Sequence, residues 1–139
     1  MSKIILLLFL SLPAWNLEAS AASLSGSLAL GRQYYSSGQY ELAYDHFFTL
    51  FKDNPGDTEI NFLLGRSALA KRDYEAAVMA FERVLLIAPA ETAVKVELGK
   101  AFFYLGDIET AQQYFREALQ GELAADVRGN LQEFLAGIK

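Results

Sequence analysis

Apolar and polar positions in residues 24–125 follow the periodicity of α-helices, and the pattern recurs every 34 residues. Five columns are identical in all three copies: Leu30, Leu64 and Leu98; Gly31, Gly65 and Gly99; Ala43, Ala77 and Ala111; Phe47, Phe81 and Phe115; and Glu41, Glu75 and Glu109. Two weaker columns are Tyr40, Tyr74 and Ile108, and Pro55 and Pro89, which Leu123 breaks. The period predicts three copies of one structural unit, at 24–57, 58–91 and 92–125.

Polar turns divide each unit into two helices. The turns are Ser37-Gly38-Gln39, Lys71-Arg72-Asp73 and Leu105-Gly106-Asp107, in which the two aspartates are suited to cap the following helix. The predicted helices are 24–36, 40–52, 58–70, 74–87, 92–104, 108–120 and 126–137. The last one lacks the Leu-Gly pair but keeps an apolar stripe of Val127, Leu131, Phe134 and Ile138, so we expect it to cap the array.

The repeated small and large residues have a physical explanation. A glycine inside a helix costs about 1 kcal/mol relative to alanine, so its recurrence at the same position indicates close approach of a neighbouring helix. The repeated alanine indicates the same for the second helix of each unit. The repeated phenylalanine lies four residues further along that helix, on the same face, and is expected to fill the space between the paired helices.

The Leu-Gly pair, the later Ala, the Phe four residues on and the terminal Pro resemble the signature of the tetratricopeptide repeat family. The aromatic residue that often opens such a repeat is absent, because Ser27, Asn61 and Lys95 occupy that position. The resemblance implies an all-α fold, an α-solenoid of three helix-turn-helix repeats plus a C-terminal capping helix. It also implies a concave groove, lined mainly by the first helix of each unit, in which peptides bind.

The N-terminal 21 residues have the features of a signal peptide. A positive start at Lys3 precedes the apolar run Ile4–Leu12, and Ala19-Ser20-Ala21 fits a small-x-small cleavage pattern. We predict cleavage after Ala21 and a periplasmic or secreted mature protein. The alternative, a membrane anchor, needs about 20 apolar residues, and Pro13 interrupts this run too early.

Composition narrows the function classes. The net charge of −5 disfavours nucleic acid and anionic membrane surfaces as partners. The absence of cysteine excludes disulfides, thiolate metal sites and a lipidated cysteine, and His46, the only histidine, leaves no material for a catalytic triad or a histidine metal cluster. We interpret His46 as a partly buried structural residue and expect no enzymatic activity, no cofactor and no metal.

One residue after each repeated glycine stands a cation, namely Arg32, Arg66 and Lys100. The helical spacing places apolar and aromatic residues beside them, four residues before or three to four after: Leu28, Phe62 and Val96, then Tyr35, Leu69, Phe103 and Tyr104. We predict a partner-binding surface made of Arg32, Arg66, Lys100, Tyr35, Phe62, Phe103 and Tyr104, suited to a segment that carries carboxylates. The alternative is that these are solvated cations whose stems cover apolar surface.

Two functions follow as hypotheses. The first is an adaptor or scaffold that binds a segment of another cell-envelope protein. The second rests on residues 111–138, from Ala111 to Ile138, which resemble the end of the periplasmic repeat domain of surface lipoprotein assembly modifier-type outer-membrane proteins. That resemblance implies a periplasmic receptor domain of a translocation or assembly system, which contacts the membrane only through a partner or through a C-terminal region beyond Lys139.

Overall fold

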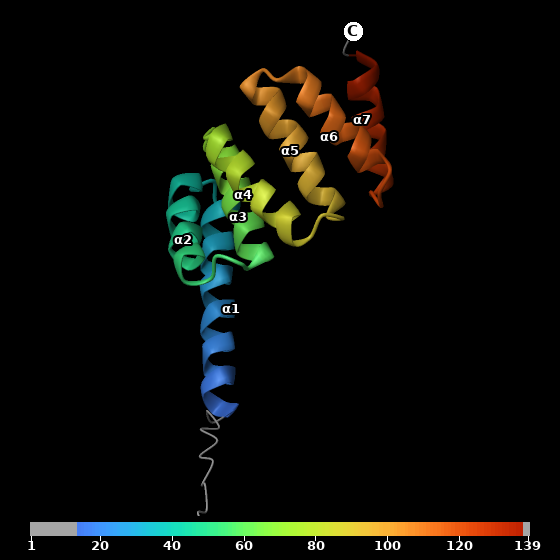
Figure 1. The fold of residues 1–139 in the computed structure, drawn as a ribbon. Helices are drawn as coiled ribbons and strands as arrows, with labels where there is room; N and C mark the ends of the chain where they lie inside the picture. Colours follow the sequence, from blue (N-terminus) through green and yellow to red (C-terminus); the bar gives the residue numbers. More distant parts are fainter. Residues whose placement is uncertain (1–13, 138–139) are drawn as a thin grey trace, which may run out of the picture.

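The computed structural model describes residues 14–137, which form seven α-helices and no strand (Figure 1). The helices are α1 (Ala14–Ser36), α2 (Tyr40–Asp53), α3 (Thr58–Ala70), α4 (Tyr74–Ile87), α5 (Thr92–Leu105), α6 (Ile108–Leu119) and α7 (Ala125–Gly137). The apolar run Ile4–Leu12 of the predicted signal peptide and Ile138 of the predicted capping stripe lie outside the described residues. No helix within the described range combines the length and the apolar character needed to cross a membrane.

Six helices begin and end within one residue of their predicted bounds, but α1 does not. It begins at Ala14, ten residues before the predicted start at 24, and it runs through the predicted cleavage position after Ala21. The predicted start was wrong because it followed from the repeat period, which places the first helices of the units at 24, 58 and 92, rather than from a signal that would end the helix. Residues 14–23 are rich in alanine and contain no proline or glycine that would end a helix.

The turns inside the three units share one backbone feature. Gly38, Arg72 and Gly106 occupy equivalent positions, and all three have positive φ, at 76°, 67° and 86°. Glycine adopts this conformation without strain, whereas a residue with a β-carbon does so at a cost. Arg72 is therefore the strained member of the set.

The predicted aspartate caps are present, and one more was not predicted. Asp73 accepts a hydrogen bond from the backbone N–H of Ala76 at 3.2 Å, and Asp107 accepts one from Thr110 at 3.1 Å. At the start of α3, Asp57 caps in the same way. The predicted caps are thus confirmed, and each helix start gains a partner for an otherwise unpaired backbone donor.

The glycine and phenylalanine columns interlock as predicted. An added β-carbon on Gly31 would lie 2.5 Å from the ring of Phe47, and one on Gly65 would lie 2.6 Å from the ring of Phe81. Gly99 meets Phe115 in the same way. Ala43, Ala77 and Ala111 are fully buried, so each helix pair closes over a small side chain and a large one.

Two of the positions that lack the usual aromatic residue carry other contacts. Asn61 is fully buried, and its side-chain amide donates to the carbonyl oxygens of Pro55 at 2.9 Å and Asp57 at 2.8 Å. Lys95 pairs with Glu117 at 3.3 Å. Polar contacts to the preceding turn and to the partner helix thus take the place of aromatic packing.

The first helices of the units form the inner side of the stack. The backbone of α1 contacts that of α3, and α3 contacts α5, whereas within residues 14–137 no such contact joins α2 to α4 or α4 to α6. Helices on the inside of a curved stack lie closer together than those on the outside. The surface made by α1, α3 and α5 is therefore concave.

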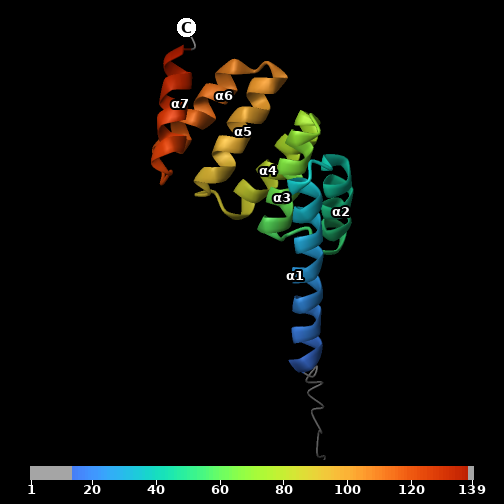
Figure 2. The ribbon, with the colours of Figure 1, turned by 180° about the vertical axis from the view of Figure 1, so that it is seen from behind.

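The two ends of the stack differ, as both ribbon views show (Figure 1, Figure 2). At one end α1 projects past the other helices, and its Leu30 is 40% exposed although the equivalent Leu64 is only 3% exposed. At the other end α7 packs on α6 and buries Leu131 against Phe115. The predicted capping helix is confirmed, and the N-terminal end has no equivalent cover within the described chain.

Candidate functional site

A groove of about 680 Å³ lies on the concave side of the stack, between α1, α3, the turn after α3 and α5. Its lining residues are Tyr35, Arg66, Leu69, Ala70, Arg72, Tyr74, Glu97, Lys100 and Tyr104. Four residues of the predicted binding surface, Tyr35, Arg66, Lys100 and Tyr104, therefore come together here. Three cations and one carboxylate give the groove a positive charge on a protein of net charge −5.

Arg66 is held by Tyr35 rather than by a carboxylate. Its guanidinium lies over the tyrosine ring, 4.9 Å from the ring centroid, and its Nη2 donates to the tyrosine hydroxyl at 3.3 Å. Among residues 20–137, whose side chains the structure describes, Arg66 forms no ion pair. The contact orients the guanidinium and leaves most of its donors for a ligand, because an arginine carries five N–H groups.

Lys100 has an acidic neighbour on its own helix. Its Nζ lies 2.9 Å from Oε1 of Glu97, three residues earlier on α5, and the lysine side chain remains 46% exposed. The Glu97 side chain is only 17% exposed, so it belongs to the wall of the groove. An ammonium group carries three N–H donors, so Lys100 can bind a ligand carboxylate beside Glu97.

Arg72 is a groove residue that the sequence reasoning missed, because it was interpreted only as part of a turn. It lines the groove from the strained backbone position that glycine occupies in the other two units. It also forms no ion pair in the described part of the chain. The repeat alignment offered one signal for it, because Arg72 stands at the turn position that Gly38 and Gly106 occupy in the other two units.

Tyrosines provide the rest of the groove wall. Tyr74, at the start of α4, stacks on Tyr104 of α5 with the ring centroids 5.1 Å apart and the planes 14° apart. Tyr74 was also missed as a site residue, since it was interpreted as a repeat column. The stack joins the second and third units across the groove and exposes an aromatic surface next to the cations.

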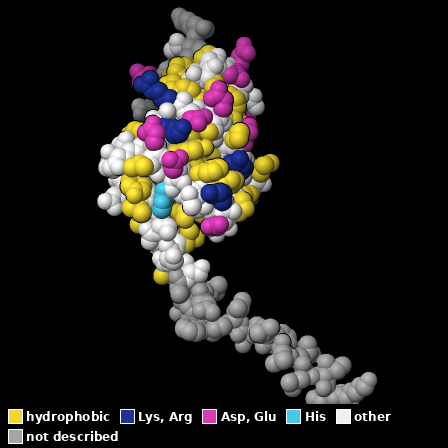
Figure 3. Space-filling view, turned by 90° about the vertical axis from the view of Figure 1, so that its left-hand side faces the viewer, with side chains coloured by type: hydrophobic (Ala, Val, Ile, Leu, Met, Phe, Trp, Pro, Cys, Tyr) yellow, Lys and Arg dark blue, Asp and Glu magenta, His cyan; other side chains and the backbone are white. Residues whose placement is uncertain are grey.

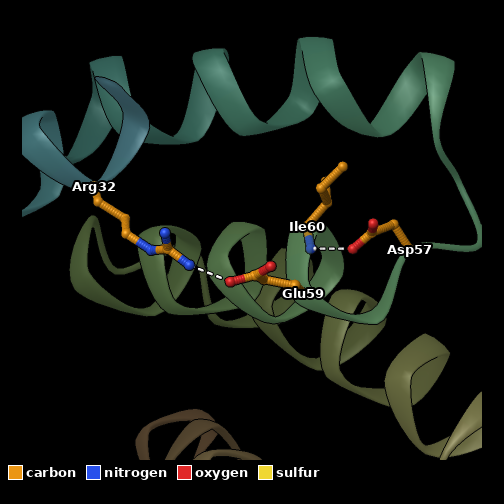
Figure 4. A network of polar contacts seen from close by, with 4 residues as sticks. All are labelled: Arg32, Asp57, Glu59 and Ile60. Atoms are coloured by element: carbon orange, nitrogen blue, oxygen red, sulfur yellow. Dashed lines mark hydrogen bonds and ion pairs between the residues drawn. The ribbon is translucent and has the colours of Figure 1, made fainter. Parts of the chain in front are cut away.

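Arg32 lies apart from this groove. Its guanidinium pairs with Glu59 on α3, close to the Asp57 cap of that helix (Figure 4). Arg32 does not line the groove, although it occupies the same repeat position as Arg66 and Lys100. The three aligned cations thus have three different surroundings, namely a glutamate on the next unit, a tyrosine and a glutamate on the same helix.

The two predicted phenylalanines also lie outside the groove. Phe62 packs against the core and Phe81, with ring centroids 5.9 Å apart, and it lines a smaller hollow between α3 and α5. Phe103 faces α7, where its ring meets that of Phe134 at 5.0 Å. The flanking Leu28 and Val96 are buried in the core.

The remaining chemistry of the described residues is structural. His46 is half-buried, in agreement with its interpretation from the sequence, and its Nε2 lies 2.7 Å from the carbonyl oxygen of Ser27, so it joins α2 to α1. No three His, Asp or Glu side chains converge within residues 20–137 in a way that could hold a metal ion. The face shown in Figure 3 mixes acidic, basic and apolar side chains rather than presenting one sign of charge.

Comparison with known families identifies the fold. Two family models described as tetratricopeptide repeat match residues 28–92 and residues 93–120, which together make up most of the chain. The chain belongs to the tetratricopeptide repeat family. Membership confirms the predicted all-α repeat fold, while the unit boundaries at 24–57, 58–91 and 92–125 stay a prediction.

Solved structures similar to this tetratricopeptide repeat protein are themselves helical repeat domains. PcrH in complex with the chaperone binding region of PopD has a TM-score of 0.77 and 20% identity, over 84% of this chain and 90% of that one. The type III secretion translocator chaperone SycD of Yersinia enterocolitica has a TM-score of 0.79 and 18% identity, over 85% and 84% of the two chains. These values show a shared fold.

A third similar structure is the first repeat domain of Spaghetti (RPAP3) bound to the HSP90 peptide SRMEEVD, with a TM-score of 0.69 and 16% identity over 80% of this chain and 91% of that one. No protein of curated function matches the sequence significantly. Because the matched models describe the repeat in general, the resemblance of this tetratricopeptide repeat protein to surface lipoprotein assembly modifier-type proteins stays a prediction.

Proposed function

We propose that the protein is an exported binding module that holds an acidic segment of another cell-envelope protein in the groove between α1, α3 and α5. The observation that carries this proposal is the pair Arg66 and Arg72, which line one groove and form no ion pair within the described residues. An unpaired arginine in a groove is suited to bind a carboxylate through two parallel hydrogen bonds.

The aromatic wall supports the same function. Tyr35 holds the guanidinium of Arg66, and Tyr74 and Tyr104 form a stacked pair beside it. Tyrosines provide rigid contact area with little loss of conformational entropy on binding, and their hydroxyl groups can bond to a peptide backbone. The groove therefore combines charge recognition with a preformed surface.

The peptides bound by similar structures also support the proposal. PcrH is described with the chaperone binding region of PopD, and Spaghetti with the peptide SRMEEVD, whose letters include three acidic residues. The present groove has its own set of residues, and the proposal for it rests on Arg66, Arg72 and Lys100. The family's use of such domains as protein-binding modules agrees with an adaptor rather than an enzyme.

The envelope location is inferred from the N-terminal 21 residues. Fusion-free expression in a bacterial host, osmotic shock and N-terminal sequencing test it: the expected product lies in the periplasmic fraction and begins at Ala22. An Ala21→Lys variant should keep its leader, because a large charged residue does not fit a small-x-small site. An uncleaved wild-type protein in the cytoplasm would contradict export.

Selection from a random dodecapeptide library on the immobilised protein tests the groove. We expect peptides enriched in aspartate and glutamate, and we expect an Arg66→Ala/Lys100→Ala variant to lose that enrichment. Arg32→Ala is the matched control, because it removes an equivalent cation that lies outside the groove. Selected peptides without acidic enrichment, or equal loss in the control, would contradict the proposal.

A further inference from the structure

Another hollow lies between α5 and the capping helix α7. It measures about 260 Å³, and its lining residues are Lys100, Phe103, Tyr104, Phe115, Asn130, Leu131 and Phe134. Apart from Lys100 and Asn130 every one of these side chains is apolar or aromatic. We call this hollow the α5–α7 slot.

The slot borders the groove. Lys100 and Tyr104 line both spaces. A row of aromatic contacts also connects them: Tyr74 stacks on Tyr104, Tyr104 meets Phe103 at 5.7 Å, and Phe103 meets Phe134 at 5.0 Å. A segment lying in the groove over Tyr104 therefore reaches the mouth of the slot.

The slot is open although a capping helix covers this end. Phe103 remains 36% exposed and Tyr104 58% exposed, and Phe134 is only half-buried between Phe103 and Phe115. Exposed aromatic side chains gathered around one hollow mark a binding surface more often than scattered apolar residues do. A cavity of roughly 150 Å³ already admits a benzene ring, so this volume accommodates one large apolar side chain.

The position of Lys100 decides which ligand fits. Lys100 lines both the groove and the slot, so a carboxylate bound to it places the neighbouring residues of the same chain next to the slot. The apolar and aromatic side chains that line the rest of the slot disfavour a second charged group there. They favour a phenylalanine, tyrosine or leucine side chain.

We propose that the α5–α7 slot binds one large apolar side chain of the same partner segment whose carboxylate contacts the groove at Lys100. The inference rests on the proposed function, since it assigns a second feature to the same ligand. The capping helix then contributes to recognition as well as to closing the solenoid. The recognised segment carries an acidic residue with a large apolar residue a few positions away.

A blocking variant separates the slot from the groove. Asn130 is exposed on α7 and lines the slot, so Asn130→Trp fills the hollow without removing a core residue. Gln132→Trp is the matched control, because Gln132 is exposed on the same helix and does not line the slot. Circular dichroism and thermal unfolding show whether each variant keeps the helical fold.

The probe is an acidic dodecapeptide selected on the Asn130→Trp protein, which reports on the groove alone. Phenylalanine is then placed at each non-acidic position in turn, and fluorescence anisotropy gives the dissociation constant on all three proteins. We expect phenylalanine at one or more positions to raise the affinity of the peptide about tenfold for wild type and for Gln132→Trp. The same peptide should gain about twofold or less in affinity for Asn130→Trp.

The other outcomes are distinguishable. If no acidic peptide is recovered, the proposed function fails and this inference fails with it. If acidic peptides bind but phenylalanine raises their affinity at no position, or raises it equally for Asn130→Trp, the proposed groove function stands and the slot inference is overturned. Loss of a wild-type dimer in Asn130→Trp, seen by sedimentation, would assign the slot to a second copy of the chain and overturn it as well.

Discussion

Gly65 of α3 lies against the ring of Phe81 of α4, so closely that a β-carbon on the glycine would lie 2.6 Å from the phenylalanine Cε1. Phe81 is fully buried, so its ring can shift only by displacing the side chains packed around it. The same relationship joins Gly31 to Phe47 and Gly99 to Phe115. Each unit therefore depends on one helix position that tolerates no side chain.

The first prediction follows from this contact. Gly65→Ala should lower the free energy of unfolding by about 2 kcal/mol, because overpacking of a buried ring outweighs the gain in helix propensity. Gly129→Ala is the control: Gly129 lies inside α7 with open space around it, so the same change should raise stability by about 0.5–1 kcal/mol. Urea unfolding followed by circular dichroism measures both, and an unchanged Gly65→Ala protein would refute the interlock.

The second prediction concerns the strained arginine of the groove. Arg72→Gly should raise the free energy of unfolding by about 1 kcal/mol, because glycine adopts φ near 67° without a β-carbon clash. The same variant should bind acidic dodecapeptides roughly fivefold more weakly, because it removes one groove cation. Arg72→Ala should lose the same affinity without the gain in stability. Equal peptide affinity of the wild type and both variants would show that Arg72 does not contribute to binding.

The third prediction concerns the carboxylate inside the groove. Glu97→Gln frees Lys100 from its partner at 2.9 Å and should raise affinity for acidic peptides roughly threefold, an effect that shrinks as salt is added. Glu117→Gln is the matched control, because it breaks the Lys95 pair outside the groove. Titrations at low and high ionic strength measure the difference. A gain in the control of the same size would show a general charge effect.

The fourth prediction is a pH dependence. The side chain and backbone N–H of Thr110 hydrogen bond to the Asp107 carboxylate and hold its pKa below the ordinary value of 3.8. A pKa lowered by folding means that the carboxylate stabilises the native state above the unfolded-state pKa, and that this contribution is lost as the pH falls through the lowered value.

Asp107→Asn removes the titration while it keeps a side-chain acceptor at the cap. The difference in unfolding free energy between wild type and variant should therefore be constant above about pH 5 and should shrink below pH 4. Urea titrations at a series of pH values measure it. A difference that does not change between neutral and acidic pH would contradict the role of the charged cap.

Most of the fold could be predicted because its determinants are local and repeated. The spacing of Gly65 and Phe81 recurs in three units, and turn residues such as Asp73 mark the helix starts, so the helix bounds followed to within a residue. The start of α1 could not be predicted in the same way. Its alanine-rich beginning has no stop signal, and the cleavage pattern near Ala21 carries no information about helix ends.

The candidate site was only partly predictable. Aligned positions after the glycines identified Arg66 and Lys100, and helical spacing identified Tyr35 and Tyr104. The repeat alignment could not show that Arg32 differs from Arg66 and Lys100. Its partner Glu59 is 27 residues away in sequence and approaches only when α3 packs beside α1.

The sequence by itself determined the three-unit all-α array, its turns and its capping helix, because periodic apolar packing and local caps require only neighbouring residues. Tertiary structure alone decided which cations share a groove, since pairing depends on the side chains that adjacent units bring together. It also decided that Arg72 faces the groove from a strained turn, and that α7 leaves a slot beside Phe103 instead of closing over it.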